Sequence, residues 1–187
     1  SALFDLAANN DDIVVRHSCI AALENLNAEA AAAANSTADS PEARLVSVIV
    51  LRRLASPALS KFLEDSDPLV QREAIRAIYD TPAIKTAAGQ KVASLGSVGS
   101  LPETVQRRIV AANFHLGSDQ NAGRLLDMAA DTSLELSIRE AALQGLRKWT
   151  TPPVTDPVLG HYRPLQESTR GANTLIAAIG KDLSRYL

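Results

Sequence analysis

A short residue pattern recurs five times along the chain, and this repetition constrains the fold more than any other feature. Each copy has a small or branched residue, then Arg or Gln, then a small or apolar residue three positions later. In four copies an apolar residue follows after four more positions. The copies begin at Val15, Ala43, Val70, Val105 and Ile138, at intervals of 28, 27, 35 and 33 residues. Intervals of this size are typical of solenoids built from pairs of helices.

The apolar positions of each copy form one stripe on a helix. In the last copy Ile138, Ala142, Leu146 and Trp149 follow one another at helical spacing, so their side chains point to the same side. Helices this short are marginal in isolation. The pattern therefore predicts that each stripe is buried against neighbouring helices, at about 1.5–3 kcal/mol for each large side chain.

Helix starts are marked by a capping residue followed by proline. The side-chain oxygen accepts an otherwise unpaired amide, and proline loses nothing at the first helical position. Such pairs occur at Ser40-Pro41, Ser56-Pro57 and Asp67-Pro68. They predict helices over residues 41–54, 57–64 and 68–79. Ser100 and Glu103 predict a capping box before the fourth copy.

The rest of the chain completes an all-α architecture. Helices are expected at 121–131 paired with 134–149, and at 84–95 paired with 103–116, with a short helix and a loop in 27–39. Four prolines forbid a continuous helix in 150–166. The predicted fold is an α-α superhelix (α-solenoid) of about five helix pairs. Its parts are repeats over 1–150, a Pro-rich capping segment over 151–166, and a C-terminal helix over 167–187 that could begin a further repeat.

Composition and charge narrow the function. Hydrophobic residues make up 46% but aromatic residues only 4%, which suits closely packed helices better than a β-sandwich. The formal net charge of −2 provides no general attraction to nucleic acid or to anionic membranes. The single cysteine, Cys19, cannot form an intrachain disulfide and leaves the cellular compartment undecided. No apolar run is long enough for a transmembrane helix.

The helices that begin with Val-Arg or Ile-Arg resemble the second helix of HEAT repeats, so the resemblance implies about five HEAT-like helix pairs. In that family the Arg and an Asp near the preceding turn form a ladder between repeats. The matching pairs here are Asp12/Arg16, Asp131/Arg139 and, less regularly, Asp39/Arg44. Gln71 replaces the Arg that Asp67 would need, so the expected ladder is partial.

A narrower resemblance rests on three short strings. They are 62–68 (FLEDSDP) leading into 73–78 (EAIRAI), 112–117 (ANFHLG) and 159–165 (LGHYRPL). Together they resemble the HEAT segment of planctomycete and verrucomicrobial proteins that combine a sorbosone-dehydrogenase-like β-propeller with a haem-binding, cytochrome c-type domain. The resemblance implies an exported or periplasmic dehydrogenase as the parent protein. The propeller's cofactor site and the haem-attachment Cys-x-x-Cys-His are both absent from these residues, so no catalytic residue and no cofactor are expected in this segment.

Side chains that often carry chemistry are scattered. His17, His115 and His161 do not share metal-ligand spacing, and Cys19 lies on a predicted buried stripe. An acidic corner at residues 64–67 could hold a cation, but the role of Asp67 as a helix cap explains it. No nucleophile elbow or phosphate-binding loop is present.

A candidate interaction surface comes from basic pairs and from the end of the repeat pattern. Its members are Arg52, Arg53, Arg72, Arg76, Arg107, Arg108, Trp149, Tyr162 and Arg163. The basic residues could bind an anionic partner if they align, whereas solvated helix faces are the commoner role. Trp149 and Tyr162 could form a hydrophobic lid on the helix stack, or a docking surface for an adjoining domain.

The sequence thus favours a non-catalytic HEAT-repeat scaffold or protein-interaction module. Its expected partners are proteins or adjoining domains of the same chain, without nucleic acid or membrane, and the expected state is a monomer. The alternative is an independent HEAT-fold protein that binds nucleic acid, or an enzyme resembling DNA glycosylases. That alternative needs a continuous basic groove or a pocket with convergent polar groups.

Overall fold

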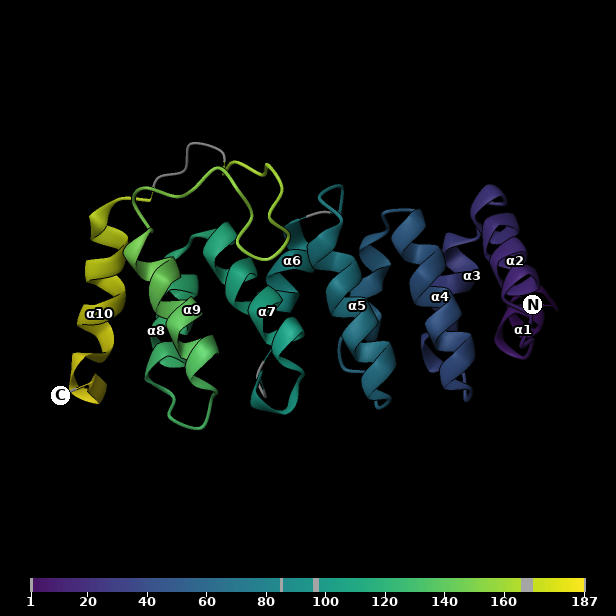
Figure 1. Cartoon of the computed structure of the whole chain (residues 1–187), viewed down its shortest axis with the longest axis horizontal. Coiled ribbons are helices and arrows are strands. Elements are labelled where there is room, and N and C mark those ends of the chain that lie inside the picture. Colours follow the sequence, from purple (N-terminus) through teal and green to yellow (C-terminus); the bar gives the residue numbers. More distant parts are fainter. Residues whose placement is uncertain (1, 85, 96–97, 166–169, 187) are drawn as a thin grey trace. The chain divides into compact units, whose positions relative to one another are not determined.

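The computed structural model describes residues 2–84, 86–95, 98–165 and 170–186, and within these residues the protein is all-helical. No β-strand occurs in the described part, where one isolated bridge joins Thr155 to Tyr162. The chain forms two compact units, Ser1–Val92 and Ala93–Leu187. The all-α prediction is confirmed, and Figure 1 shows the order of the helices along the chain.

Unit 1 contains short helices packed mainly on a central one. Its elements are α1 (Ala2–Ala8), α2 (Ile13–Asn25), α3 (Glu29–Ala34), η1 (Asn35–Thr37), α4 (Pro41–Arg53), η2 (Pro57–Phe62) and α5 (Pro68–Asp80), followed by α6 (Thr86–Ala93). Helix α4 packs against α1, α2, α3 and α5, so it forms the centre of the unit. The helix predicted over residues 57–64 is a shorter 3₁₀ helix, η2.

Unit 2 packs around α8. Its elements are η3 (Val98–Ser100), α7 (Glu103–Leu116), α8 (Asp119–Ala130), α9 (Leu136–Arg147) and α10 (Ala172–Tyr186). Helix α8 packs against α7, α9 and α10, and α7 also packs against α9. Between α9 and α10 the Pro-rich segment has no helix in its described residues, and Figure 1 shows it crossing the ends of α7 and α9.

The predicted stripes form the core. Ile138, Ala142 and Trp149 are completely buried, as are Val105 and Ile109 in the preceding copy. The equivalent stripes in unit 1 are also buried, at Cys19 and Leu23, Ser47 and Leu51, and Val70, Ala74 and Ile78. The interpretation of Cys19 as a small buried side chain is therefore confirmed.

One stripe position is polar, and the structure shows how its burial is compensated. Asn113 occupies the apolar position of the fourth copy and is fully buried. Its amide donates to the carbonyl oxygens of Ala93 and Ile109, at 2.9 and 3.0 Å, and its oxygen accepts from Asn121 at 2.9 Å. Each of its polar groups is paired, so burial does not leave an unsatisfied amide.

The predicted proline-linked helix starts are confirmed. Ser40 accepts from the amide of Ala43, Ser56 from that of Ala58, and Asp67 from those of Leu69 and Val70.

The predicted capping box at Ser100 and Glu103 is wrong. The residue before helix α7 is Pro102, which provides no side-chain cap, and Glu103 accepts from Arg107 and Ser137 instead. A capping box does form at the start of α8, between Ser118 and Asn121.

The second residue of every repeat copy makes the same kind of hydrogen bond. Its side chain donates to a main-chain carbonyl near the end of the helix or turn that precedes its own helix. The pairs are Arg16 Nε–Ala7 O, Arg44 Nη1–Ala38 O, Gln71 Nε2–Leu63 O, Gln106 Nε2–Leu101 O and Arg139 Nε–Ala129 O, at 2.6–3.2 Å. Carbonyls at helix ends have no partner within their own helix, so this position supplies the missing donor. We call these five bonds the helix-end clamps.

The expected ladder of Asp and Arg side chains is replaced by hydrogen bonds to main-chain carbonyls and by one buried ion pair. Arg44 binds the main-chain carbonyl of Asp39, while its guanidinium forms a two-point ion pair with the carboxylate of Asp65, at 2.8 and 2.9 Å. This pair connects α4 to the turn before α5. The carboxylate of Asp12 caps α2 and that of Asp131 accepts from Ser133, so neither is used as a ladder partner in the hydrogen bonds of the described residues.

The ion pair between Arg44 and Asp65 should dominate the polar contribution to the stability of unit 1. Both side chains are about nine-tenths buried or more, and removal of one partner leaves a buried charge. We expect Arg44→Met to lower the free energy of unfolding by roughly 3–5 kcal/mol. Denaturant unfolding followed by circular dichroism measures this, because the only tryptophan lies in unit 2.

The matched control is Arg53→Met, which removes an exposed pair with Glu24 at 3.0 Å. Its expected cost is at most about 1 kcal/mol. Equal losses in the two variants would show that the buried pair does not have the assigned role.

Candidate ligand-binding groove

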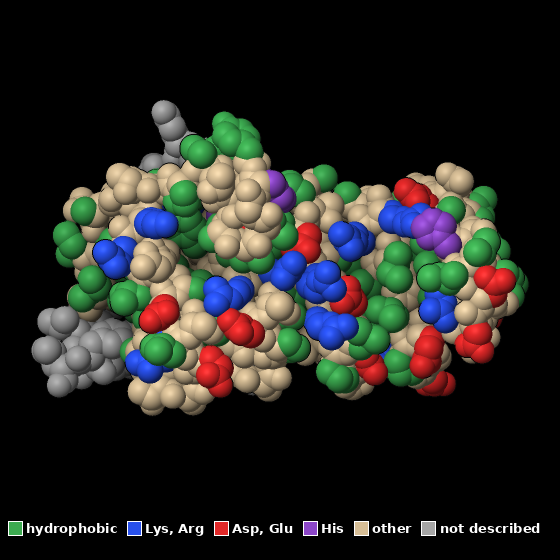
Figure 2. Space-filling model, in the orientation of Figure 1, with side chains coloured by type: hydrophobic (Ala, Val, Ile, Leu, Met, Phe, Trp, Pro, Cys, Tyr) green, Lys and Arg blue, Asp and Glu red, His purple; other side chains and the backbone are tan. Residues whose placement is uncertain are grey.

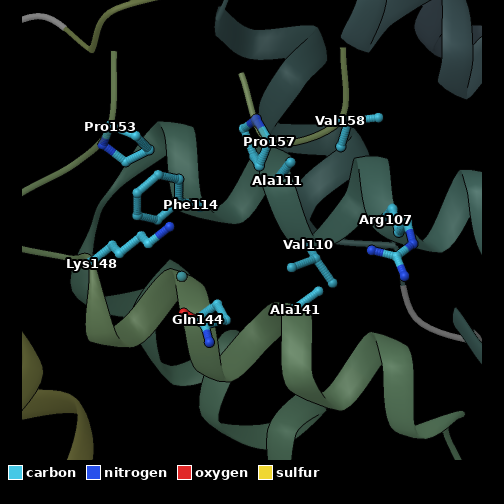
Figure 3. Close-up of a pocket in the computed structure, with 11 residues that line it drawn as sticks. Arg107, Val110, Ala111, Phe114, Ala141, Gln144, Lys148, Pro153, Pro157 and Val158 are labelled. Atoms are coloured by element: carbon cyan, nitrogen blue, oxygen red, sulfur yellow. The ribbon is translucent and has the colours of Figure 1, made fainter. Parts of the chain in front are cut away.

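A groove of about 230 Å³ opens in unit 2 between α7, α9 and the Pro-rich segment. It is lined by Arg107, Val110, Ala111 and Phe114 from α7, Ala141, Gln144, Gly145 and Lys148 from α9, and Pro153, Pro157 and Val158 from the Pro-rich segment. Figure 3 shows these side chains converging from three elements. Most of the lining is apolar, so the groove suits an apolar group with polar contacts at its edges.

Small residues create this space. Ala111 and Ala141 contribute only methyl groups to the lining. Gly145 leaves the space next to Phe114 and Leu125 open, since a methyl group at this position would lie in ordinary contact with both side chains, at 3.5 Å. The residues that made the repeat pattern rich in small side chains therefore also shape the floor of the groove.

Asp156 organises the Pro-rich wall. Its side chain is fully buried; Oδ1 accepts from the amides of Val158 and Leu159, both at 2.8 Å, and Oδ2 accepts from Arg163 at 3.1 Å. Main-chain bonds between Asp156 and His161 and between Val154 and Arg163 close the turn. The wall that presents Pro157 and Val158 is thus held by an internal network.

His115, near the end of α7, lies beside this wall. Its Nε2 lies 3.8 Å from Asp156 Oδ2. Burial, followed by the positive charge of Arg163, lowers the pKa of His115 to about 4, while Asp156 acts in the opposite direction and Arg170 adds a smaller lowering. The imidazole is therefore neutral at physiological pH.

Arg170 connects the C-terminal part of the chain to the same helix end. Its guanidinium lies between the rings of Phe114 and Trp149, 5.0 and 5.1 Å from their centroids, and donates to the carbonyl of His115 at 2.6 Å. This position is favourable for a cation in two ways, because the aromatic rings attract it through cation–π interactions and the helix C-terminus carries a partial negative charge. Gly117 has a φ of 68°, and a side chain there would collide with this guanidinium, with Cβ 2.6 Å from Arg170 Cζ.

The charged groups of the groove are cationic. Arg107 Nε and Nη2 both donate to Glu103, which also accepts from Ser137. The bonds from Arg107 and then Ser137 hold the pKa of Glu103 below its usual range. Lys148 is exposed and has no ion-pair partner in the described part of the chain. The groove therefore combines an apolar floor with an unpaired ammonium group and a half-paired guanidinium.

The predicted basic residues of unit 1 are mostly paired at the surface. Arg53 binds Glu24, and Arg72 and Arg76 share Glu73 at 3.2 and 2.8 Å. Arg52 is exposed on α4. In Figure 2, acidic side chains lie among and beside basic ones on the face that is drawn.

The predicted residues of unit 2 have different environments. Trp149 is fully buried and Arg108 is 9% exposed, whereas Tyr162 is 74% exposed. Arg107 lines the groove and Arg163 belongs to its wall. The side chains of Trp149 and Tyr162 are therefore separated, one in the core and one on the surface. Contact of any of these residues with a partner stays a prediction.

The other candidate residues have structural surroundings. His17 and His161 are exposed. In the acidic corner Asp65 pairs with Arg44 and Asp67 caps α5. Within the residues that the structure describes, no three His, Cys, Asp or Glu side chains gather as a metal site would require, and no helix is long and apolar enough to cross a membrane.

Several residues of the groove and its wall were not predicted from sequence. Asp156-Pro157 repeats the signal of Asp67-Pro68, and both aspartates accept from the amides two and three residues later. That dipeptide could have identified the ordered turn. No local signal distinguishes Lys148 or Arg170 from other surface cations, because their roles depend on packing between distant segments.

Comparisons with protein-family models, with curated proteins and with solved structures gave no match to this chain.

The largely buried side chain of His115, which is 12% exposed, should make unit 2 sensitive to acid. The pKa of His115 is about 4 in the folded protein and near 6.5 when exposed. The unfolded state therefore binds the additional proton between these values, and stability present above pH 6.5 is lost as the pH falls towards 4. The loss can reach about 3 kcal/mol. Denaturant unfolding followed by Trp149 fluorescence at pH 7.5, 5.5 and 4.5 measures it.

We expect the fall in stability between pH 7.5 and 4.5 to be smaller in His115→Gln than in the wild-type protein. The variant His161→Gln, which removes an exposed histidine of the same wall, controls for loss of a histidine as such. An unchanged pH dependence in His115→Gln would contradict the assignment.

Proposed function

We propose that this chain is a non-catalytic scaffold and protein-interaction module, built as an α-solenoid of about five HEAT-like helix pairs. The observation that carries the proposal is the recurrence of the helix-end clamps. The same position in five successive copies donates to the end of the preceding element, at 2.6–3.2 Å. In a stack of similar units, equivalent positions are expected to make equivalent contacts, as this position does.

The polar groups in unit 2 support a binding role over catalysis. Arg107, Gln144 and Lys148 line different parts of the groove. His115 and Asp156 come closest to an acid–base pair, but the Asp156 carboxylate already accepts two backbone amides and Arg163. These groups stabilise the wall, whereas catalytic groups would need to converge on a reacting atom.

The experiment is site-specific photocrosslinking of the full-length protein in its native cells. The photoreactive residue p-benzoylphenylalanine would replace Tyr162 on the wall, Leu143 on α9 and Arg52 on α4, all of which are exposed. We expect ultraviolet-dependent adducts with another protein, or with an adjoining domain of the same chain, from at least one position. The same cells without irradiation are the control.

The alternative function is tested on the same protein with labelled duplex and single-stranded DNA. We expect no saturable binding, because acidic side chains accompany Arg53, Arg72 and Arg76. Salt-sensitive binding that is lost in Arg72→Glu/Arg76→Glu, with no protein adduct from any crosslinking position, would replace the scaffold proposal with nucleic-acid binding.

We further propose that the parent protein is an exported or periplasmic dehydrogenase-like protein. Support comes only from the resemblance of residues 62–68, 73–78, 112–117 and 159–165 to the HEAT segment of such proteins. The genomic reading frame provides the test: we expect a β-propeller upstream and a Cys-x-x-Cys-His haem-attachment motif downstream. A frame that encodes neither would remove the dehydrogenase context and leave the interaction module to be tested by itself.

A further inference from the structure

We propose that the groove of unit 2 binds an extended peptide segment of a partner protein, with an apolar centre between acidic residues. This inference rests on the proposed interaction function and names the class of partner. The site consists of α7, α9 and the Pro-rich wall, with Phe114, Pro157 and Val158 providing apolar surface and Lys148 and Arg107 providing charge. The following observations lead to this occupant.

The size and the lining of the groove indicate that the centre of the bound peptide is apolar. Its volume of about 230 Å³ is large enough for one or two aliphatic side chains but small for a folded domain. Phe114 is 4% exposed and belongs to the core, so the groove reaches a rigid aromatic surface. An aliphatic side chain would gain burial there without a change in the fold.

The positions of the two cations indicate that the bound peptide carries acidic residues on both sides of its apolar centre. Figure 3 places Lys148 at one side of the groove and Arg107 at the other, with the apolar residues between them. In the described part of the chain, no acidic side chain lines the groove. Glu103 accepts from Nε and Nη2 of Arg107, which leaves Nη1 for a ligand. A segment with one carboxylate at each end complements both cations.

The wall is preorganised for such a ligand. The network of Asp156 holds the turn that carries Pro157 and Val158, and Arg170 stacks on Phe114 and Trp149 from the core. Neither Asp156 nor Arg170 lines the groove, so a bound segment need not displace them. Binding then carries little ordering cost on the protein side.

The test uses the full chain and a fluorescein-labelled peptide that has Leu-Ala-Leu between two Asp-Asp pairs, with fluorescence anisotropy as the readout. We expect saturable binding with a micromolar Kd that weakens with salt. Lys148→Glu should weaken binding about tenfold, because an attraction becomes a repulsion. Arg147→Glu is the matched control: it reverses an exposed charge one residue away that does not line the groove, so it should change Kd less than about twofold.

Two further peptides separate the contributions. Replacing both leucines by serine should abolish binding, and replacing the aspartates by lysine should do the same for the wild-type protein. The lysine peptide should bind Lys148→Glu better than it binds the wild type. Equal losses in Lys148→Glu and Arg147→Glu, or binding that does not depend on leucine, would overturn the proposal in favour of general charge attraction.

Other occupants would produce different results. A monomer–dimer equilibrium seen by light scattering and abolished by Lys148→Glu, without peptide binding, would assign the groove to a second copy of this chain. Binding of octanoate without binding of the peptide would assign it to a small carboxylate. Either result overturns the peptide proposal. Crosslinks from Arg52 on α4 without peptide binding would leave the interaction function in place and remove only this site.

Discussion

The helix-end clamps are the interaction on which the rest of the structure depends. Short helices leave many terminal carbonyls without partners, and carbonyls that are removed from water need a hydrogen-bond donor from elsewhere in the chain. One side chain at the second position of each copy supplies that donor, as Arg139 does for Ala129. Because the donor lies on the same helix as the buried stripe, burial of the stripe and pairing of the helix end occur together. This coupling explains why the sequence repeats Arg or Gln at this position.

Arg and Gln perform the clamp with different consequences. Gln71 and Gln106 donate an amide and make a local bond. Arg44 has further donors, and these reach Asp65, whose side chain is 4% exposed. The hydrogen bonds that Arg44 donates to the Asp65 carboxylate raise the pKa of Arg44, so its guanidinium stays charged in the core. The sequence suggested that Arg44 belongs to an Asp–Arg ladder between repeats. In the structure Arg44 instead has two roles: it pairs a carbonyl at the end of the preceding element, and it connects α4 to the turn that precedes α5.

In unit 2, buried polar residues support the Pro-rich wall of the groove as well as the core. Asn113 extends the core by a paired amide network, while Asp156 and Arg163 stiffen the Pro-rich wall. Arg170 holds the chain beyond that wall against the end of α7. The groove lies where these supports meet an aromatic core residue, Phe114. Its Pro-rich wall is held by the buried carboxylate of Asp156. Of its two cations, Lys148 has no ion-pair partner in the described part of the chain, whereas Arg107 is paired with Glu103.

The sequence by itself determined the all-helical class, the buried stripes and the proline-linked helix starts, since these depend on residues within one turn or one helix. It correctly placed the starts of α4, α5 and α7. Only the tertiary structure decided which carboxylate Arg44 would bind, that Trp149 would be buried while Tyr162 is exposed, and that Lys148 and Phe114 would line the same groove. Those outcomes depend on distances between segments far apart in the chain, which local patterns do not encode. The turn at Asp156 lies between the two cases, because its Asp-Pro signal is local while its contact with His115 is not.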